Sequence, residues 1–344
     1  MSQKQRVLSG MRPTGSLHLG HYHGVLKNWL DLQTKYECYF SIVDWHALTT
    51  HYDDSSSIAK DVFEMAVTWL AVGIDPKKCH IFIQSEMHEH AELHLLLSMF
   101  TPLSWLTRVP TYKDQQEKLK EKDLATYGFL GYPLLQTADI LAYNANFVPV
   151  GEDQVPHIEF AREVARRFNF LYKQPVFIEP KVLLTKTSKL PGLDGQKMSK
   201  SYHNTIALND PPKVVEQKVK TMPTDPARVR RTDKGEPERC PVWSFHKVYS
   251  DEDTKQWVQT GCRSAGIGCV ECKGPVIKAI NEELAPIQEK MAHFHAKPEE
   301  VSAILDEGTQ NAKKTAQHTL CAVKKAMGLV YPYLNKEEGT CQKS

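Results

Sequence analysis

Short apolar runs alternate with helical patterns in the first part of the chain, and this alternation restricts its fold more than any other feature. The runs at residues 7–9, 38–43 and 80–83 have the length and composition of buried strands. Residues 58–72, between two of these runs, have the spacing of an amphipathic helix. Strands separated by helices predict a parallel sheet with helices on both faces. We therefore expect an α/β fold with a Rossmann-like, doubly wound parallel sheet.

The character of the sequence changes near residue 205. Strand patterns fade after this point, and helical patterns dominate at residues 214–222, 276–292 and 298–327. A chain of 344 residues is long enough for two domains. We predict a catalytic α/β domain at residues 1–205, a smaller all-helical domain at 206–334 and a polar tail at 335–344.

The composition is that of an ordinary globular protein and excludes several function classes. The net charge of +2 is too small for a general attraction to nucleic acid, so any RNA contact must come from local basic clusters. No apolar run approaches the about 20 residues that a membrane-spanning helix needs, so we expect no membrane partner. The polar start of the chain has no signal-peptide pattern, which predicts a cytoplasmic protein. In that compartment the 8 cysteines are expected as thiols or metal ligands.

Two histidines mark the first turn from strand to helix, where open parallel sheets normally bind nucleotides. This turn has neither the dinucleotide glycine pattern nor a Walker lysine, but it carries His18 and His21 with Gly20 between them. At the start of a helix, this spacing directs both imidazoles toward the anion that the helix N-terminus attracts. The alternative is a loop with two exposed histidines and no ligand.

A second basic segment, Lys197-Met198-Ser199-Lys200-Ser201, lies in a loop that is rich in glycine, lysine and serine. Two ammonium groups three residues apart on such a loop can stabilise the charge that builds on a leaving pyrophosphate. A solvated lysine loop is the alternative. The presence of both segments in one α/β chain, in this order, argues for a divided ATP site.

Together these segments resemble the two signatures of class I aminoacyl-tRNA synthetases. His18-Leu19-Gly20-His21 is similar to the HIGH motif, and residues 197–201 match the KMSKS motif letter for letter. Residues 10–17 resemble the run that precedes HIGH in the tryptophanyl and tyrosyl enzymes. The resemblance implies that Mg-ATP is a substrate and that His18, His21, Lys197 and Lys200 are catalytic. The ATP-binding residues that it implies are Arg12, Pro13, Thr14, Gly20, His21, Lys113, Gly151, Glu152, Asp153, Leu190, Lys197, Met198, Ser199, Lys200 and Ser201. Many tryptophanyl enzymes have glutamine in place of Arg12, which leaves its exact role open.

Asp139 is the candidate for amino-acid recognition, because it places one carboxylate among the apolar residues of a predicted helix. A buried carboxylate can accept a hydrogen bond from an indole N–H or a phenol O–H, and it discriminates against side chains that lack the donor. A capped or paired helix carboxylate is the alternative. The segment resembles the pocket helix of tryptophanyl-tRNA synthetases, and this resemblance implies that Tyr132 and Gln154 hold the ammonium group of tryptophan.

The similarity to bacterial tryptophanyl-tRNA synthetases extends from residue 7 to about residue 327, and residues 224–231 are typical of that branch. The three arginines of this run could contact RNA phosphates or form a solvated helix start. The family implies a homodimer that binds tryptophan, ATP and the tRNA for tryptophan. The alternatives are a tyrosine–tRNA ligase, a HIGH-type nucleotidyltransferase and a non-enzymatic iron–sulfur RNA-binding regulator.

Four cysteines form a metal-binding pattern in the predicted helical domain: Cys240, Cys262, Cys269 and Cys272. Four thiolates suit either a structural zinc ion or a 4Fe-4S cluster. A subset of bacterial tryptophanyl-tRNA synthetases carries a 4Fe-4S cluster on nearly this spacing, so the resemblance favours iron–sulfur, with zinc as the alternative. The family also implies that such a cluster supports a loop near the tRNA anticodon. Cys38, Cys79 and Cys321 have no such spacing and are expected as ordinary thiols.

Overall fold

The computed structural model describes residues 4–109, 125–184, 190–331 and 333. Five parallel strands form one sheet with the order β3-β2-β1-β4-β5. The order reverses on either side of β1, so the gap at the carboxyl end of β1 is where this type of sheet binds ligands. The prediction of a doubly wound α/β fold is confirmed. The strands are β1 (Arg6–Met11), β2 (Glu37–Ile42), β3 (Cys79–Ile83), β4 (Phe147–Val150) and β5 (Lys181–Leu184).

Alternate side chains of the strands enter two different hydrophobic cores, one on each face of the sheet. In β2, Phe40 stacks in one core on Trp29, which also packs against Trp69, while its neighbour Tyr39 packs in the other core against Tyr143. The helices that surround the sheet, in chain order, are α1 (Leu19–His21), the π-helical turn η1 (Tyr22–Leu26), α2 (Lys27–Lys35), α3 (Asp44–His51), α4 (Ile58–Val72), α5 (His88–Ser98), α6 (Leu103–Leu106), α8 (Tyr127–Ala142) and α9 (Val155–Tyr172).

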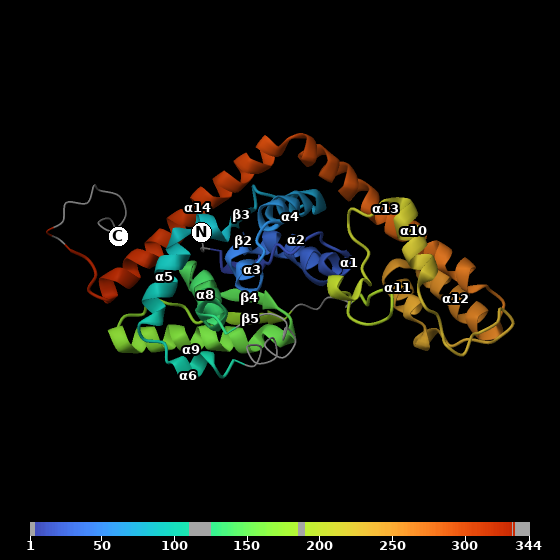
Figure 1. The fold of residues 1–344 in the computed structure, drawn as a ribbon, viewed down its shortest axis with the longest axis horizontal. Coiled ribbons are helices and arrows are strands. Elements are labelled where there is room, and N and C mark those ends of the chain that lie inside the picture. The colour runs from blue at the N-terminus through green and yellow to red at the C-terminus, as the bar shows by residue number, and fades with distance from the viewer. Residues whose placement is uncertain (1–3, 110–124, 185–189, 332, 334–344) are drawn as a thin grey trace.

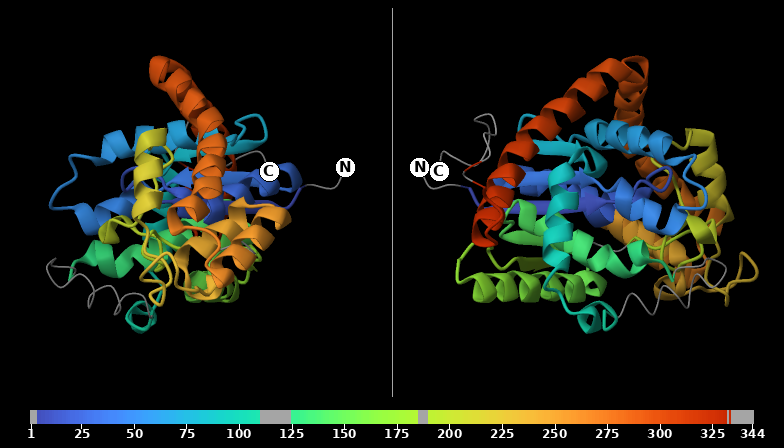
Figure 2. Two further views of the ribbon diagram at one scale, coloured as in Figure 1. Left: turned by 90° about the vertical axis from the view of Figure 1, so that its right-hand side faces the viewer. Right: turned by 60° about the vertical axis from the view of Figure 1, so that its left-hand side comes forward.

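Two long helices at the end of the described chain form an inverted V above the sheet (Figures 1 and 2). α13 (Cys269–Ala296) packs on α4, and α14 (Pro298–Ala326) returns along the edge strand β3. The two backbones are so close that a Cβ atom added at Gly308 would lie 2.0 Å from the carbonyl oxygen of Ile81. Side chains of α13 and α14 also enter the hydrophobic cores, so the predicted helical region packs directly on the sheet and its helices.

The remaining helices surround the first half of α13, at the foot of the V that lies opposite the end of α14 (Figure 1). They are α10 (Pro212–Thr221), α11 (Pro241–Tyr249) and α12 (Glu252–Ser264). Among the described helices, none combines the length and apolar character that a membrane crossing needs. Cys38 and Cys79 are buried free thiols as expected, but Cys321 is disulfide-bonded, so the prediction of a thiol there is wrong.

Candidate active site

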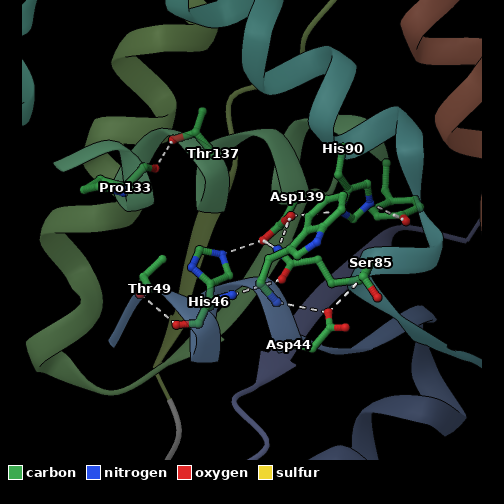
Figure 3. Close-up of polar contacts among 11 residues, drawn as sticks. Asp44, His46, Thr49, Ser85, His90, Pro133, Thr137 and Asp139 are labelled. Atoms are coloured by element: carbon green, nitrogen blue, oxygen red, sulfur yellow. Dashed lines mark hydrogen bonds and ion pairs between the residues drawn. The ribbon is translucent and has the colours of Figure 1, made fainter. Parts of the chain in front are cut away.

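Asp139 lies on α8, on the side of the helix that faces the sheet, and its side chain is only 5% exposed. Its carboxylate accepts hydrogen bonds from His46 Nε2 at 2.9 Å and from His90 Nδ1 at 2.8 Å. Gln84 Nε2 lies 2.9 Å from both carboxylate oxygens. Figure 3 shows Asp139 between the imidazoles of His46 and His90. A carboxylate of this kind is a fixed hydrogen-bond acceptor within an apolar environment.

The charge of Asp139 is maintained by these donors. Burial raises the pKa of the Asp139 carboxyl, but the hydrogen bonds from His46 and His90 outweigh burial and hold that pKa well below its usual range. His90 is itself fixed by a 2.7 Å contact between its Nε2 and the hydroxyl of Tyr143. The site therefore presents an anion to the cavity at neutral pH.

Asp139 closes the inner end of a cavity of about 470 Å³ at the carboxyl ends of β1 and β4. Apolar and aromatic groups line most of the inner part, including Phe129 and Ile140 from α8. The predicted site residues Arg12, Thr14, His21, Tyr132, Gly151 and Gln154 also line it. A concave cavity of this size, lined by both apolar groups and polar side chains, is typical of a small-molecule site.

The histidine segment, which we define as residues 18–21, lies at the mouth of this cavity. The rings of His18 and His21 stack with their centroids 3.7 Å apart. Burial, followed by the charge of Lys200, lowers the pKa of His18 to about 4. Burial, followed by His18 and by Lys200 and Lys197, lowers the pKa of His21 to about 3. Both imidazoles are therefore neutral near pH 7 and can each donate one hydrogen bond.

The lysine loop, which we define as residues 190–204, lies directly on the histidine segment. Lys200 Nζ donates to the carbonyl oxygen of Thr14, and Met198 Sδ accepts from the backbone N–H of Gly20 at 3.3 Å. A Cβ atom added at Gly20 would lie 3.3 Å from Met198 Cβ and 3.0 Å from the His18 ring, so a glycine allows this close approach. The two signatures predicted to form one ATP site are thus brought together.

Asn204 fixes the conformation of the lysine loop and was not among the residues predicted from the sequence. Its side-chain Nδ2 donates to Asp194 Oδ1 at 2.7 Å and to the Lys197 carbonyl at 3.1 Å. Its Oδ1 accepts from the backbone N–H of Ser199 at 2.8 Å. A buried asparagine that bonds to both sides of Met198 fixes where the two lysines point. Its position three residues after the KMSKS motif was the available signal.

The other predicted ATP-binding residues differ in burial and in whether they line the cavity. Glu152 and Asp153 are exposed in a short 3-10 turn and do not line the cavity. Pro13 and Leu190 are buried, and Arg12 donates to Thr50 Oγ1. Lys113 lies outside the described residues, and Ser201 is described only in its backbone, at the start of another 3-10 turn. His46, Gln84 and His90 were not predicted, although each follows the carboxyl end of a strand adjacent to β1 or β2.

The cysteine site, which we define as Cys240, Cys262, Cys269 and Cys272, lies where α11, α12 and α13 meet. Burial, followed by the three other thiols, raises the pKa of Cys272 to about 12, which is consistent with four side chains close to one another. No group of three or more His, Cys, Asp or Glu side chains in the described part of the chain is arranged as it stands to hold a metal ion. The four cysteines predicted from their spacing lie near one another, but their side chains are not arranged to coordinate a metal ion as they stand.

Two buried cations flank the cysteine site. Arg228 Nη1 lies 3.9 Å from Cys262 Sγ, and its Nη2 donates to the carbonyls of Arg231 and Ile267. Lys273 is 3% exposed and donates to the carbonyls of residues 220 and 222. Arg228 is therefore structural, so neither the RNA contact nor the solvated helix start that the sequence left open describes it. Residues 224–231 are also not a helix start, and Arg230 and Arg231 are the exposed arginines of that run.

Comparisons with known proteins agree with this geometry. The family model described as tRNA synthetases class I (W and Y) matches residues 1–285. A tryptophan–tRNA ligase of Ralstonia nicotianae is 53% identical over 95% of this chain and 99% of its own length. The corresponding ligase of Thermotoga maritima is 52% identical over 95% and 100%. A solved tryptophanyl-tRNA synthetase from Campylobacter jejuni, complexed with ADP and tryptophan, superposes with a TM-score of 0.86 at 32% identity, covering 94% of this chain and 100% of that chain.

Proposed function

Because the chain belongs to the class I tRNA synthetases for tryptophan and tyrosine, we infer from its full-length relatives that it is a tryptophan–tRNA ligase. It activates L-tryptophan with ATP to tryptophanyl-adenylate and pyrophosphate, and then transfers tryptophan to the 3′ end of its tRNA. The observation that carries this function is the cavity that extends from the histidine segment to the anionic acceptor Asp139.

For the pocket, we propose that Asp139 accepts the indole N–H of tryptophan. Of its three hydrogen-bond donors, His46 is the one that lines the cavity, so the indole reaches the carboxylate beside His46. Side chains that lack a ring donor would leave the buried charge less well solvated, which disfavours their binding. Tyr132 and Gln154 hold the ammonium group, and Arg12 lies near the amino-acid carboxylate or the ATP.

For the activation step, the tryptophan carboxylate attacks the α-phosphorus of Mg-ATP in line, and the bond to the pyrophosphate breaks. Catalysis is mainly positioning and charge stabilisation, so no covalent enzyme intermediate is needed. His18 and His21 donate hydrogen bonds to phosphate oxygens, and Lys197 and Lys200 stabilise the leaving pyrophosphate. The remaining ATP contacts are proposed for Pro13, Thr14, Gly20, Lys113, Gly151, Glu152, Asp153, Leu190, Met198, Ser199 and Ser201.

For the helical region, residues 206–334, we propose contact with the tRNA anticodon in a homodimer that acts in the cytoplasm. Arg230 and Arg231 are exposed and can meet RNA phosphates. They line a hollow together with Cys269, which places the cysteine site beside this surface.

The cysteine site is proposed to bind a 4Fe-4S cluster, with zinc as the alternative. Arg228 and Lys273 are buried beside the thiols, and their side chains donate to backbone carbonyls and to one sulfur. Buried cations need anionic neighbours, and four metal-bound thiolates would supply this charge. We expect iron, inorganic sulfide and brown visible absorption in protein purified without oxygen, and loss of all three in Cys269→Ser but not in Cys79→Ser. Stoichiometric zinc without iron would select the alternative, and no metal would exclude both.

The test of the main function is amino-acid-dependent exchange of pyrophosphate into ATP. We expect exchange with tryptophan, at least about 1,000 times less with tyrosine at equal concentration, and none without an amino acid. Exchange that needs no amino acid would instead indicate a nucleotidyltransferase. Binding of tRNA without any exchange would indicate a non-enzymatic RNA-binding protein.

A further inference from the structure

The turn of the lysine loop rests on the first residue of α11. Gly195 has a left-handed backbone with φ +84°, and a Cβ atom added there would lie 2.9 Å from Pro241 Cγ. The same turn is tied to the lysines, because Asp194 and Lys197 share the amide of Asn204. The ring of Pro241 therefore lies against the turn of the lysine loop.

The N-terminal end of α11 is part of the cysteine site. Cys240 directly precedes Pro241 and is the N-cap residue of α11. One turn later, His246 Nε2 lies 3.1 Å from the carbonyl oxygen of Cys272 and 3.4 Å from its sulfur. Because both contacts fix α11 to the start of α13, the position of Pro241 depends on how the four cysteines are held.

The other end of α11 reaches the helix that follows the histidine segment. The hydroxyl of Tyr249 lies 2.9 Å from Glu283 Oε2 and 2.7 Å from His23 Nε2. His23 is two residues after His21, in the π-helical turn, and Lys27 Nζ binds Glu283 at 2.7 Å. One short helix of nine residues thus contacts the lysine loop at its start and the histidine helix at its end.

From this arrangement we propose that α11 positions the lysine loop over the histidine segment, and that the cysteine site, through Cys240 and Pro241, sets how fully the loop is closed. The proposal rests on the proposed function, because it assigns the closed loop to ATP binding. When α11 is displaced, the closed loop becomes less populated, and the apparent affinity for ATP falls by that fraction.

The test compares Pro241→Ala with Pro298→Ala, since both prolines occupy the first position of a helix. In Pro241→Ala we expect faster hydrogen–deuterium exchange in peptides from residues 190–204 and a KM for ATP raised about fivefold. The KM for tryptophan and kcat should change little, and Pro298→Ala should match the unmodified protein. Unchanged exchange of the loop and an unchanged KM for ATP in Pro241→Ala would overturn the role of α11.

The role of the cysteine site is tested separately with Cys269→Ser, whose side chain is on α13 and not in the lysine loop. We expect the same faster exchange of residues 190–204, with Cys79→Ser as the matched control. Faster exchange confined to residues 240–275 would show that the cysteine site does not act on the loop. Either negative result leaves the proposed function intact if the unmodified protein catalyses tryptophan-dependent exchange of pyrophosphate into ATP.

Discussion

The two ends of the active-site cavity differ in how completely their polar groups are hydrogen-bonded. At the inner end, the three donors His46, Gln84 and His90 hold the Asp139 carboxylate, and Gln84 Nε2 is shared between its two oxygens, which leaves one acceptor position for a ligand donor. At the mouth, His18 Nδ1 and Arg12 Nε are buried with no hydrogen-bond partner among the described residues. Lys200 lies near both histidines and lowers their pKa values. The polar groups of the inner end are thus held in place by protein partners, whereas the mouth has a surplus of donors and positive charge.

This difference indicates that the two ends of the cavity have different roles. A hydrogen-bonded carboxylate keeps a fixed geometry, which suits discrimination between ring side chains. Unpartnered donors and neighbouring cations are unfavourable until an anion binds, and a triphosphate supplies both acceptors and charge. We infer that the amino-acid pocket is preformed and that the ATP site is completed by its substrate.

The largest effect is expected for Asp139→Ala, which removes the buried acceptor at the inner end of the cavity. The substitution leaves three buried donors without their acceptor, so we expect a loss of about 3–5 kcal/mol in the free energy of unfolding. Tryptophan-dependent exchange of pyrophosphate into ATP should fall by at least about 1,000-fold. Denaturant titration and exchange kinetics measure the two effects.

Asp306→Asn is the control for this variant, because Asp306 is exposed on α14 far along the chain from the cavity. Activity within about twofold of the unmodified protein in Asp139→Ala would show that the indole is not recognised here. Asp139→Asn separates charge from shape, since it retains the size of the side chain while removing the anion.

The next effect concerns the mouth of the cavity, where Lys200→Ala removes one cation. We expect the rate of exchange to fall about 100-fold, because a charge that stabilises the leaving pyrophosphate is lost. Tryptophan binding in the absence of ATP should stay nearly unchanged, which isothermal titration calorimetry can measure. The control is Lys213→Ala on the exposed face of α10. An unchanged exchange rate in Lys200→Ala would contradict the role assigned to the lysine loop.

A smaller effect is expected for Asn204→Ala, which alters the shape of the lysine loop but removes none of its charges. The Ser199 amide, the Lys197 carbonyl and the Asp194 carboxylate would lose their bonds to the Asn204 side chain, so the two lysines would point in more directions. We predict a KM for ATP raised about tenfold with an unchanged KM for tryptophan. An equal increase in both KM values would mean that the variant has lost the fold rather than the loop geometry.

The sheet and the ATP signatures could be predicted from the sequence because their signals are local. The continuous apolar run at residues 38–43 and the spacing of His18 and His21 need no knowledge of distant contacts. The role of Asp139 as a buried acceptor was likewise visible from its apolar neighbours.

The supporting residues could not be predicted in this way, because each depends on a contact between distant segments. Gln84 and His90 reach Asp139 across about 50 positions of the chain. In the sequence, Arg228 could be an RNA contact or part of a solvated helix start, but its side chain is buried and donates to the Ile267 carbonyl. Only the packing of α12 and α13 decides whether such an arginine is exposed.

The smallest effect, a change in the pH dependence of stability, distinguishes the two ends without altering the chemistry. In the unfolded chain a histidine titrates near its ordinary pKa of about 6.5, whereas burial lowers the pKa of His18 to about 4. Between these values the unfolded state binds the extra proton, so this contribution to stability is lost as the pH falls from about 6.5 toward 4. The lowered pKa of Asp139 acts in the same direction, but only below its unfolded value of about 3.9. Burial also lowers the pKa of His157 and of His246 to about 4, so these side chains add to the slope between pH 6.5 and 4.5. The contribution of the mouth is therefore the difference between the unmodified protein and a variant that lacks His18.

We expect His18→Gln to reduce that slope by about one bound proton, in denaturant midpoints measured at pH 4.5, 5.5 and 6.5. His318→Gln, on the exposed face of α14, is the control and should leave the slope unchanged. ATP should flatten the slope of the unmodified protein, because phosphate oxygens favour the protonated histidine and raise its pKa toward the unfolded value. A slope that is the same with and without ATP would place the triphosphate away from His18, and the contrast between the two ends of the cavity would then have another cause.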